Sequence, residues 1–354
     1  MGTLLKAGIC GHFGGGLPPA EGQTVKTVIF SQKLEEIWGS EQVLKLDTYQ
    51  WRRHSLRLIL GSLRLIRKCQ NIIMLPSHNG VKVFIPLFLF LNRFYRKKLQ
   101  YVIIGAWLPE FLEASPRLRA QMKKLDGLYA ETQTMADKLN AMGISRVHLL
   151  PNFKELKIVE KPDASAFQEP FRLCTFSRVI REKGICEAVS AVRQVNEQLG
   201  REVYTLDIWG AVASGFQEDF ERLEAGFPAF IRYKGCLSYR DTTDTLKEYF
   251  AMLFPTRYRG EGIPGAVLDA YAAGLPVLAS RFYAAPEIID HGVTGLLLDF
   301  DHITEALIKT LCGLAREPQV LLSMRIACVC RATDFQANRV VREFADMLEQ
   351  EEKK

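Results

Sequence analysis

The sequence predicts an α/β protein with two parallel sheets, each covered by helices on both faces, and three observations carry this prediction. Short apolar runs typical of buried strands alternate with amphipathic helical windows. The alternation stops at residues 154–170, a polar stretch interrupted by Pro162 and Pro170, and then begins again. The length of 354 residues suits two domains, each able to bury a core of its own.

The first predicted domain covers residues 1–153. A strand at 4–13 runs into a glycine-rich turn, and a loop through Pro18 and Pro19 leads to a helix at 22–38. The other predicted elements, in order, are strand 42–47, helix 51–68, strand 71–75, helix 81–96, strand 100–105, broken helix 108–124, strand 127–131, helix 134–142 and strand 147–150.

The second predicted domain covers residues 171–334 and follows the linker at 154–170. It has the same architecture as the first without a visible sequence repeat. Its predicted elements, in order, are strand 173–176, helix 183–198, strand 204–209, helix 215–225, strand 231–235, helix 241–247, strand 249–254, helix 264–274 and strand 276–280, with helix almost throughout after Asp301. Such Rossmann-like domains bind ligands beyond the carboxyl ends of their strands.

The stretch 258–274 is the most informative part of the chain. It lies between two strand-like runs, and Pro264 and Gly274 suit the first position and the C-terminal cap of a short helix. Unpaired amides and the positive end of the helix dipole make the start of such a helix an anion site. Glu261 lies there and would repel an anion, but it can accept hydrogen bonds from hydroxyls. Phosphate and polyol together indicate a nucleotide sugar.

The same residues resemble a known family. Glu261 and Asp269 are separated by seven residues, with Gly-Ile-Pro after the first and Ala-Gly-Leu-Pro-Val a few residues after the second. This resembles the donor-site signature of the retaining glycosyltransferases of family four, the glycosyl transferases group 1. The likeness continues through residues 285–297. It implies the GT-B fold, with two Rossmann-like domains facing a cleft and a C-terminal helix, residues 335–354, crossing back to the first domain.

A cationic turn follows the first strand of the second domain. Arg178 offers a planar fork for phosphate oxygens, and Lys183 adds a charge five residues later. Cations at a helix start favour an external anion, because that position normally suits acids. The alternative is a solvated helix start. The turn is similar to the diphosphate clamp of the family, with Ser177 where a glycine is common.

The resemblance assigns roles to these residues. Arg178 and Lys183 would stabilise the leaving nucleoside diphosphate, and Glu261 would orient the sugar. Asp269 would hold the ribose, although the family has a glutamate there and the alternative is an exposed helix acid. The remaining expected donor-binding residues are glycines and one neighbour: Gly14, Gly15, Gly210, Gly262 and Ile263.

The first domain matches the family only loosely. Thr24 and Lys26 begin a helix expected to face the same cleft. Much of the family has a sugar-contacting histidine after the fourth strand, but residues 105–108 contain none. His12 or His78 is a candidate substitute, or Trp107 and Glu110 shape the sugar pocket. His78 is placed in a loop, where a structural role is the alternative.

Composition restricts the function further. A net charge of +6 suits phosphate-bearing substrates or an anionic membrane surface, and nucleic acid is not an expected partner. The eight cysteines lack zinc spacing, so we expect reduced thiols. We expect Asp301 of the Asp299-Phe300-Asp301 run to cap a helix rather than bind metal, and no metal to be needed. No signal peptide or spanning helix is expected. Residues 83–98 are either a buried helix or a membrane-facing one.

The predicted function is therefore that of a metal-independent hexosyltransferase. It would move a sugar from a nucleotide sugar to a lipid-linked saccharide acceptor. The setting would be the synthesis of bacterial capsule, exopolysaccharide or lipopolysaccharide. It would be cytoplasmic or peripheral at the inner face of the plasma membrane. The alternative is a non-catalytic, transferase-like subunit that binds nucleotide sugar beside a partner enzyme. A nicotinamide-dependent dehydrogenase is disfavoured, because G-x-G-x-x-G follows neither opening strand.

Overall fold

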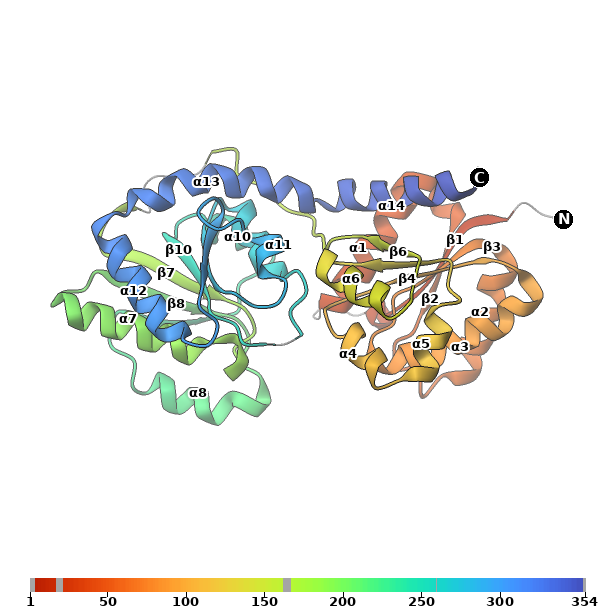
Figure 1. The fold of residues 1–354 in the computed structure, drawn as a ribbon, viewed down its shortest axis with the longest axis horizontal. Helices are drawn as coiled ribbons and strands as arrows, with labels where there is room; N and C mark the ends of the chain where they lie inside the picture. The colour runs from red at the N-terminus through yellow and green to blue at the C-terminus, as the bar shows by residue number, and fades with distance from the viewer. Residues whose placement is uncertain (1–3, 17–21, 162–166, 259, 353–354) are drawn as a thin grey trace. The chain divides into compact units, whose positions relative to one another are not determined.

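The computed structural model describes residues 4–16, 22–161, 167–258 and 260–352. The predicted loop through Pro18 and Pro19, Pro162 of the linker and Arg259 lie outside these residues. The chain forms two compact units: unit 1 comprises Met1–Glu155 and Phe335–Lys354, and unit 2 comprises Leu156–Asp334. Figure 1 shows each unit as a sheet with helices on its two faces. The prediction of two Rossmann-like domains is confirmed.

The sheet of unit 1 has six parallel strands in the order β2-β1-β3-β4-β5-β6. They are β1 (Leu5–Gly11), β2 (Val43–Asp47), β3 (Cys69–Met74), β4 (Lys98–Val102), β5 (Gly127–Ala130) and β6 (Val147–Leu149). The helices are α1 (Gly22–Trp38), α2 (Ser55–Lys68), α3 (His78–Tyr95), α4 (Leu108–Glu113), α5 (Pro116–Met122), α6 (Gln133–Ala141) and α14 (Ala337–Glu352).

Unit 1 buries a core on each face of its sheet. One core joins α2, α3 and α5 to the strands, and the other joins the strands to α1 and α14. The rings of Phe30 on α1 and Phe344 on α14 lie 5.0 Å apart at a steep angle, and Tyr129 of β5 contacts the same Phe344 ring at 4.7 Å. The indole of Trp38 donates a hydrogen bond to Glu349 over 2.8 Å. The predicted return of the C-terminal helix to the first domain is confirmed.

The sheet of unit 2 has six parallel strands in the order β12-β11-β10-β7-β8-β9. They are β7 (Phe171–Phe176), β8 (Tyr204–Trp209), β9 (Ile231–Gly235), β10 (Ala251–Phe254), β11 (Val277–Ser280) and β12 (Gly295–Leu298). The helices are α7 (Ile185–Leu199), α8 (Gln217–Glu224), α9 (Thr242–Leu246), α10 (Gly265–Ala272), α11 (Ala285–Ile288), α12 (Ile303–Arg316) and α13 (Gln319–Ala332).

Several local predictions need correction. His78 is the first residue of α3 and does not lie in a loop, and α2 begins at Ser55, four residues later than expected. Pro264 precedes α10 by one residue. Asp301 does not cap α12, whose N-cap is His302 without a side-chain cap, and the Asp299 carboxylate accepts hydrogen bonds from the amides of residues 301 and 302 in the turn before the helix. These errors lie at element boundaries, where side chains choose between local partners that a periodic pattern does not reveal.

The structure bears on two further expectations, that the cysteines are reduced and that no helix spans a membrane. All eight cysteines are free, and half of them are buried. Within the described ranges, no helix is both long and apolar enough to cross a bilayer. Within residues 83–98, Phe84, Ile85 and Phe88 are buried, as expected of a buried helix, whereas Phe90 and Phe94 are exposed. The membrane-facing alternative stays a prediction.

Candidate functional site

The donor-site candidates of unit 2 converge at the point where its strand order reverses. The chain runs from β7 to β8 and β9 on one side, whereas β10 pairs with β7 on the other side. In an open parallel sheet this switch point leaves a crevice beyond the carboxyl ends of the two central strands. The turn that follows β7 carries Arg178 and Lys183, and the turn that follows β10 carries Glu261.

Lys183 and Glu261 are in direct contact. The Lys183 ammonium donates a hydrogen bond to Oε1 of Glu261, and both residues are buried, at 9% and 7% exposure. The ammonium also lies 5.2 Å from the ring centroid of Phe254 and 5.3 Å from that of Tyr258. Thr256 places its hydroxyl 3.4 Å from the same Glu261 oxygen. The fold therefore brings together two residues that lie 78 positions apart in the sequence. Two aromatic rings, of Phe254 and Tyr258, lie beside the ammonium.

Burial has a large effect on the protonation of Lys183. Loss of hydration first, and then the nearby charge of Arg178, lower the pKa of Lys183 to about 7. The carboxylate of Glu261, in contact with the ammonium, opposes this lowering. A lysine with a pKa near neutrality beside the charge of Arg178 suits an anion, since a phosphate would favour the charged form of the lysine.

Two glycines allow the turns to approach each other. A Cβ atom on Gly184 would collide with the carbonyl oxygen of Pro255, and one on Gly210 would collide with that of Ser177. Both glycines also have positive φ angles, of 75° and 137°. The amide of Gly210 donates a hydrogen bond to the carbonyl of Gly235. In the structure, Gly210 therefore allows the turn that carries Arg178 to pack closely against it.

Replacing Gly184 by alanine should destabilise unit 2 by about 2–4 kcal/mol. About 1–2 kcal/mol is the cost of a left-handed backbone at a residue with a Cβ atom, and about 1–3 kcal/mol comes from the collision with Pro255. Gly200→Ala is the matched control, because Gly200 has a similar φ of 67° but open space around the added atom. Urea unfolding measures both variants. Equal losses would mean that the close approach contributes nothing.

The cations of the β7 turn divide into two kinds. Arg178 is exposed and has no ion pair in the described part of the chain, although its charge reaches Lys183. Arg181 forms a 2.7 Å ion pair with Asp219 on α8, and the arginine is 68% exposed. Arg181 is therefore held on the outer surface of unit 2, whereas Arg178 and Lys183 remain for a ligand.

The residues around α10 lie where the sequence placed them. Gly262 and Ile263 are buried in the turn just before this helix, next to Glu261. Asp269 lies within α10 at 6% exposure, which excludes the alternative of an exposed helix acid. A role of Asp269 in holding the ribose stays a prediction.

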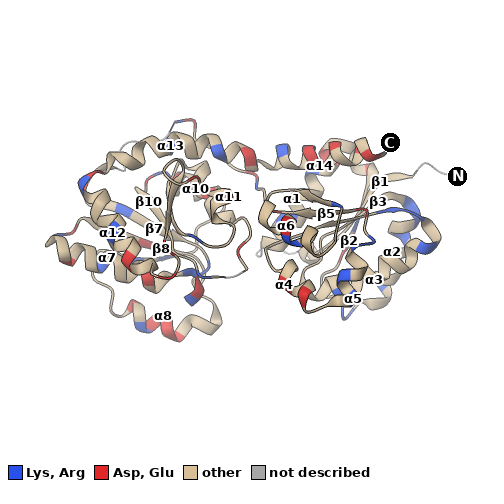
Figure 2. Cartoon of the chain, viewed as in Figure 1, with Lys and Arg blue, Asp and Glu red and all other residues tan. Residues whose placement is uncertain are grey.

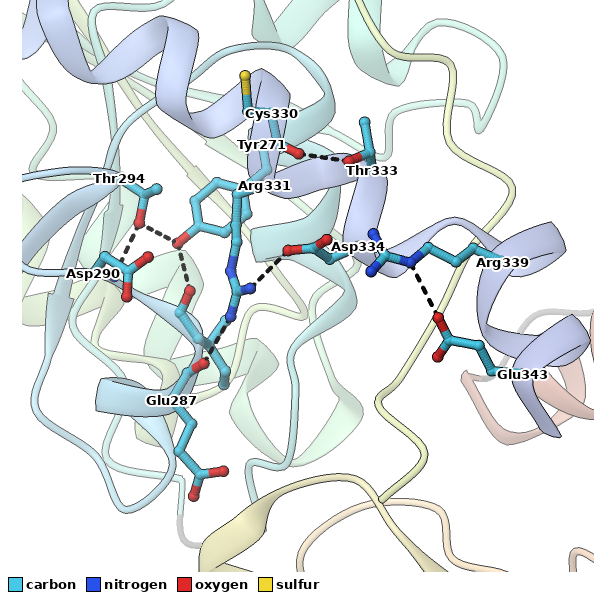
Figure 3. A network of polar contacts seen from close by, with 11 residues as sticks. Tyr271, Glu287, Asp290, Thr294, Cys330, Arg331, Thr333, Asp334, Arg339 and Glu343 are labelled. Carbon is cyan, nitrogen blue, oxygen red and sulfur yellow. Dashed lines mark hydrogen bonds and ion pairs between the residues drawn. The ribbon is translucent and has the colours of Figure 1, made fainter. Parts of the chain in front are cut away.

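A polar network fixes α10 to the second half of the family-like motif (Figure 3). The Tyr271 hydroxyl donates to the carbonyl of Ile288 over 3.0 Å and lies 2.9 Å from the Thr294 hydroxyl, which accepts from the Asp290 amide. Arg331 on α13 donates to the carbonyl of Glu287 over 3.1 Å. Residues 285–297 therefore act as a support that holds the helix and, through it, the turn of Glu261.

In unit 1, the glycine turn is folded onto Asp47 at the end of β2. The Asp47 carboxylate accepts hydrogen bonds from the amides of Phe13 and Gly15, at 2.9 and 2.8 Å. The Gly15 amide, expected to face a diphosphate, is thus occupied by a carboxylate. A Cβ atom on Gly15 would strike the ring of Tyr49, and Gly14 has a φ of 82° against Thr24. Close packing explains both glycines.

Polar side chains gather at the carboxyl ends of β1, β4 and β5, and of these Thr24, Lys26 and His12 were named from the sequence, whereas Glu131 was missed. Lys26 pairs with Glu131 at 2.7 Å, and both side chains are 3% exposed. The same carboxylate lies 3.3 Å from the amide of Gly105, and Nδ1 of His12 lies 2.7 Å from the Thr24 hydroxyl. The signal that could have found Glu131 is its place directly after a strand, where acids face the ligand edge of a sheet.

His78 and Trp107 lie together rather than apart. Their rings stack at 3.9 Å, and Phe111 meets both rings edge-on at 5.4 and 5.3 Å. The indole of Trp107 donates to the carbonyl of Ile104 over 2.7 Å. Burial, and then the charge of Lys82, lower the pKa of His78. His78 and Trp107 are thus parts of one aromatic cluster, while His12 contacts Thr24 and the ring of Tyr49.

The acids of the described residues include no group of three metal-ligating side chains. Asp299 and Asp301, spelled like a metal motif, belong to the turn before α12. The charged side chains beside the switch point of unit 2 include Arg178, Lys183 and Glu261.

Comparison with known proteins agrees with this geometry. Residues 170–317 match the family model described as glycosyl transferases group 1. Over 262 residues, the chain is 30% identical to the amylovoran biosynthesis glycosyltransferase AmsK of Erwinia amylovora, covering 68% of this chain and 60% of that protein. It is 31% identical over 143 residues to a GDP-mannose-dependent phosphatidylinositol monomannoside mannosyltransferase of Corynebacterium glutamicum, covering 38% of this chain and 36% of that one. The chain thus spans less than two thirds of these relatives.

Solved structures extend the likeness to the whole fold. Anabaena Alr3699/HepE, crystallised in complex with UDP-glucose, superimposes with a TM-score of 0.74 at 16% identity, covering 98% of this chain and 100% of that one. A glycosyltransferase from Rickettsia africae reaches a TM-score of 0.71 at 13% identity, over 98% of each chain. At such low identity these structures establish the GT-B fold alone.

Proposed function

We propose that this chain, which belongs through residues 170–317 to the family of group 1 glycosyl transferases, is an enzyme that moves a hexosyl group from a nucleotide sugar to a saccharide acceptor. The observation that carries the proposal is the buried contact of Lys183 with Glu261 beside Arg178, at the switch point of unit 2. Two cations and a carboxylate at such a point match a diphosphate attached to a sugar.

Each residue has a part in the proposed reaction. Arg178 and Lys183 stabilise the negative charge that develops on the leaving diphosphate. The turn of Gly262 and Ile263, at the start of α10, adds the positive end of a helix dipole. Glu261 accepts hydrogen bonds from sugar hydroxyls, and Asp269 holds the ribose. Protein cations supply the charge that a divalent ion supplies elsewhere, so we propose that the reaction does not depend on metal.

The finer parts of the proposal rest on the family and its named members. Retention of the anomeric configuration is the outcome typical of the family. One relative is named for amylovoran biosynthesis, and another is named for a phosphatidylinositol mannoside. They support an acceptor in bacterial surface polysaccharide synthesis, linked to lipid, and a place in the cytoplasm at the inner face of the plasma membrane.

A donor panel tests the function. UDP-, GDP- and ADP-sugars are screened by thermal shift, because the true donor raises the melting temperature by mass action. UDP- and GDP-sugars come first, since one related structure holds UDP-glucose and one relative is GDP-mannose-dependent. Release of nucleoside diphosphate is then followed in EDTA. Binding with release supports a metal-independent transferase. Binding without any release, even when acceptors are supplied, would favour a non-catalytic subunit.

The affinity for nucleotide sugar should fall as the pH rises above about 7. The charged form of Lys183 binds the diphosphate, and its pKa of about 7 in the free protein rises on binding. Affinity is thus full below pH 7 and falls, by up to tenfold per pH unit, until the pKa of the complex is reached. Isothermal titration from pH 6 to 9 measures this, since both phosphates of the donor are esterified and do not titrate there. Lys183→Met should give a flat profile.

A further inference from the structure

Helix α2 of unit 1 has a second apolar stripe that its core does not use. Leu58, Leu65 and Ile66 pack against the sheet. On another side, Leu56, Ile59 and Leu60 are 70%, 45% and 59% exposed, and Leu63, which is partly buried against the core, continues their series. These four residues recur at the i, i+3, i+4 and i+7 spacing of one helix face. An apolar face on a helix that already has a buried face indicates a partner outside the chain.

The charge around this stripe is of one sign. Residues 48–109 contain 11 lysines and arginines and no aspartate or glutamate, so the rest of the chain carries a net negative charge. Arg57, Arg64, Arg67 and Lys68 of α2 are all exposed, and none has an ion pair within the ranges the structure describes. Figure 2 shows blue residues and no red ones on α2. Within the described residues, no acidic side chain forms an ion pair with these four cations, so their charges are available to a partner.

The end of α3 adds to the same surface. The charges of Lys97, Lys68 and Arg64 all act on the buried thiol of Cys69, where they oppose the rise in its pKa that burial causes. The ends of α2 and α3 therefore lie close together, as the pairing of β3 with β4 requires. Phe90 and Phe94 of α3 are 56% and 72% exposed, and their rings meet edge-on at 6.0 Å.

The stripe of α2 borders a hollow of about 740 Å³. Leu4, Leu5, Leu60 and Leu63 form apolar walls, and the cations of the last turn of α2 line the rest of it. An apolar hollow with a cationic margin matches an amphiphile with an anionic head. It does not match nucleic acid, whose phosphates leave exposed leucines and phenylalanines without a partner.

We propose that this basic face (Leu56, Ile59, Leu60, Arg64, Arg67 and Lys68 of α2, with Phe90 and Phe94 of α3) docks on the surface of an anionic phospholipid bilayer. The apolar side chains enter the headgroup boundary, and the cations lie at the level of the lipid phosphates. An anionic bilayer fits this face because it offers both partners that the face needs: apolar lipid for the exposed leucine, isoleucine and phenylalanine side chains, and negative phosphates for the cations. The face belongs to unit 1 alone, so the proposal does not depend on the donor residues of unit 2.

Vesicle sedimentation of the full chain tests the proposal. The probes are phosphatidylcholine vesicles with and without phosphatidylglycerol, at low and high salt. We expect binding only to the anionic vesicles, weakened by salt. Arg64→Gln/Arg67→Gln/Lys68→Gln should reduce partitioning by about 100-fold, at about fivefold for each cation. Leu56→Ser/Ile59→Ser/Leu60→Ser should reduce it by at least about tenfold without loss of a core contact.

The matched control removes the same charge from unit 2. Arg193→Gln/Lys309→Gln/Arg316→Gln changes three exposed cations and should leave partitioning within about twofold. Equal losses in both triple variants, or equal binding to neutral vesicles, would overturn the proposal in favour of nonspecific attraction. The proposal would also be overturned if Leu56→Ser/Ile59→Ser/Leu60→Ser changed only the self-association of the protein, measured by light scattering, and not its binding to vesicles. The thermal shift with nucleotide sugar, which these variants should keep, separates failure of docking from failure of the transferase function.

Discussion

Turnover should fall about a hundred- to a thousandfold when Arg178 or Lys183 is replaced by alanine. Each removes one preorganised cation from the leaving diphosphate, which corresponds to about 2.7–4 kcal/mol of transition-state stabilisation. The loss should appear in kcat at saturating donor, because the charge on the diphosphate grows as the glycosidic bond breaks. Initial rates of nucleoside diphosphate release measure it.

The two variants differ in what else they change. Arg178 is exposed, so Arg178→Ala should keep the stability of the protein. Lys183→Ala leaves Glu261 buried without its partner, which should lower stability by about 3–5 kcal/mol as well. Arg181→Ala is the matched control on the same turn, since its guanidinium is held by Asp219 and should not affect turnover. Near-normal rates in both Arg178→Ala and Lys183→Ala would overturn the assignment of the clamp.

Glu261→Gln should reduce turnover by about 10- to 100-fold and weaken donor binding together. A hydrogen bond to a charged group contributes about 1.5–3 kcal/mol, and the amide cannot accept the sugar hydroxyls in the same way. The Glu261 carboxylate keeps the pKa of Lys183 from falling further. Without it, the pKa falls, more of the lysine is neutral, and the diphosphate is bound more weakly. Kinetics and donor titration at pH 7 and at pH 6 measure both parts.

The lower pH distinguishes the two roles of Glu261. Protonation of Lys183 at pH 6 should restore much of the donor affinity of Glu261→Gln, whereas the turnover defect should remain. Glu182→Gln is the control, because that carboxylate is exposed one residue before Lys183. A variant with unchanged kcat at saturating donor would show that Glu261 serves only to balance the buried ammonium.

Much of this protein was predictable because its local signals agree. Alternating strands and helices, with Gly200 and Gly274 just beyond two helices, gave both Rossmann-like units. The order of β7 and β10 in one sheet follows from the rules of parallel sheets, and it places residues 178–183 and 260–263 at one edge. The sequence was less informative in unit 1, where the glycine turn is fixed by Asp47 at the end of another strand.

What the sequence determined by itself was the fold, the resemblance to a family and the turns that carry Arg178, Lys183 and Glu261, because periodicity, turn chemistry and motif spacing are local properties. Tertiary structure decided which charges are paired: Lys183 with Glu261, Lys26 with Glu131, and Arg181 away from the site with Asp219. It also decided that α2 leaves an apolar stripe uncovered. Pairing and burial depend on distances between residues far apart in the chain, and only the packed fold fixes those distances.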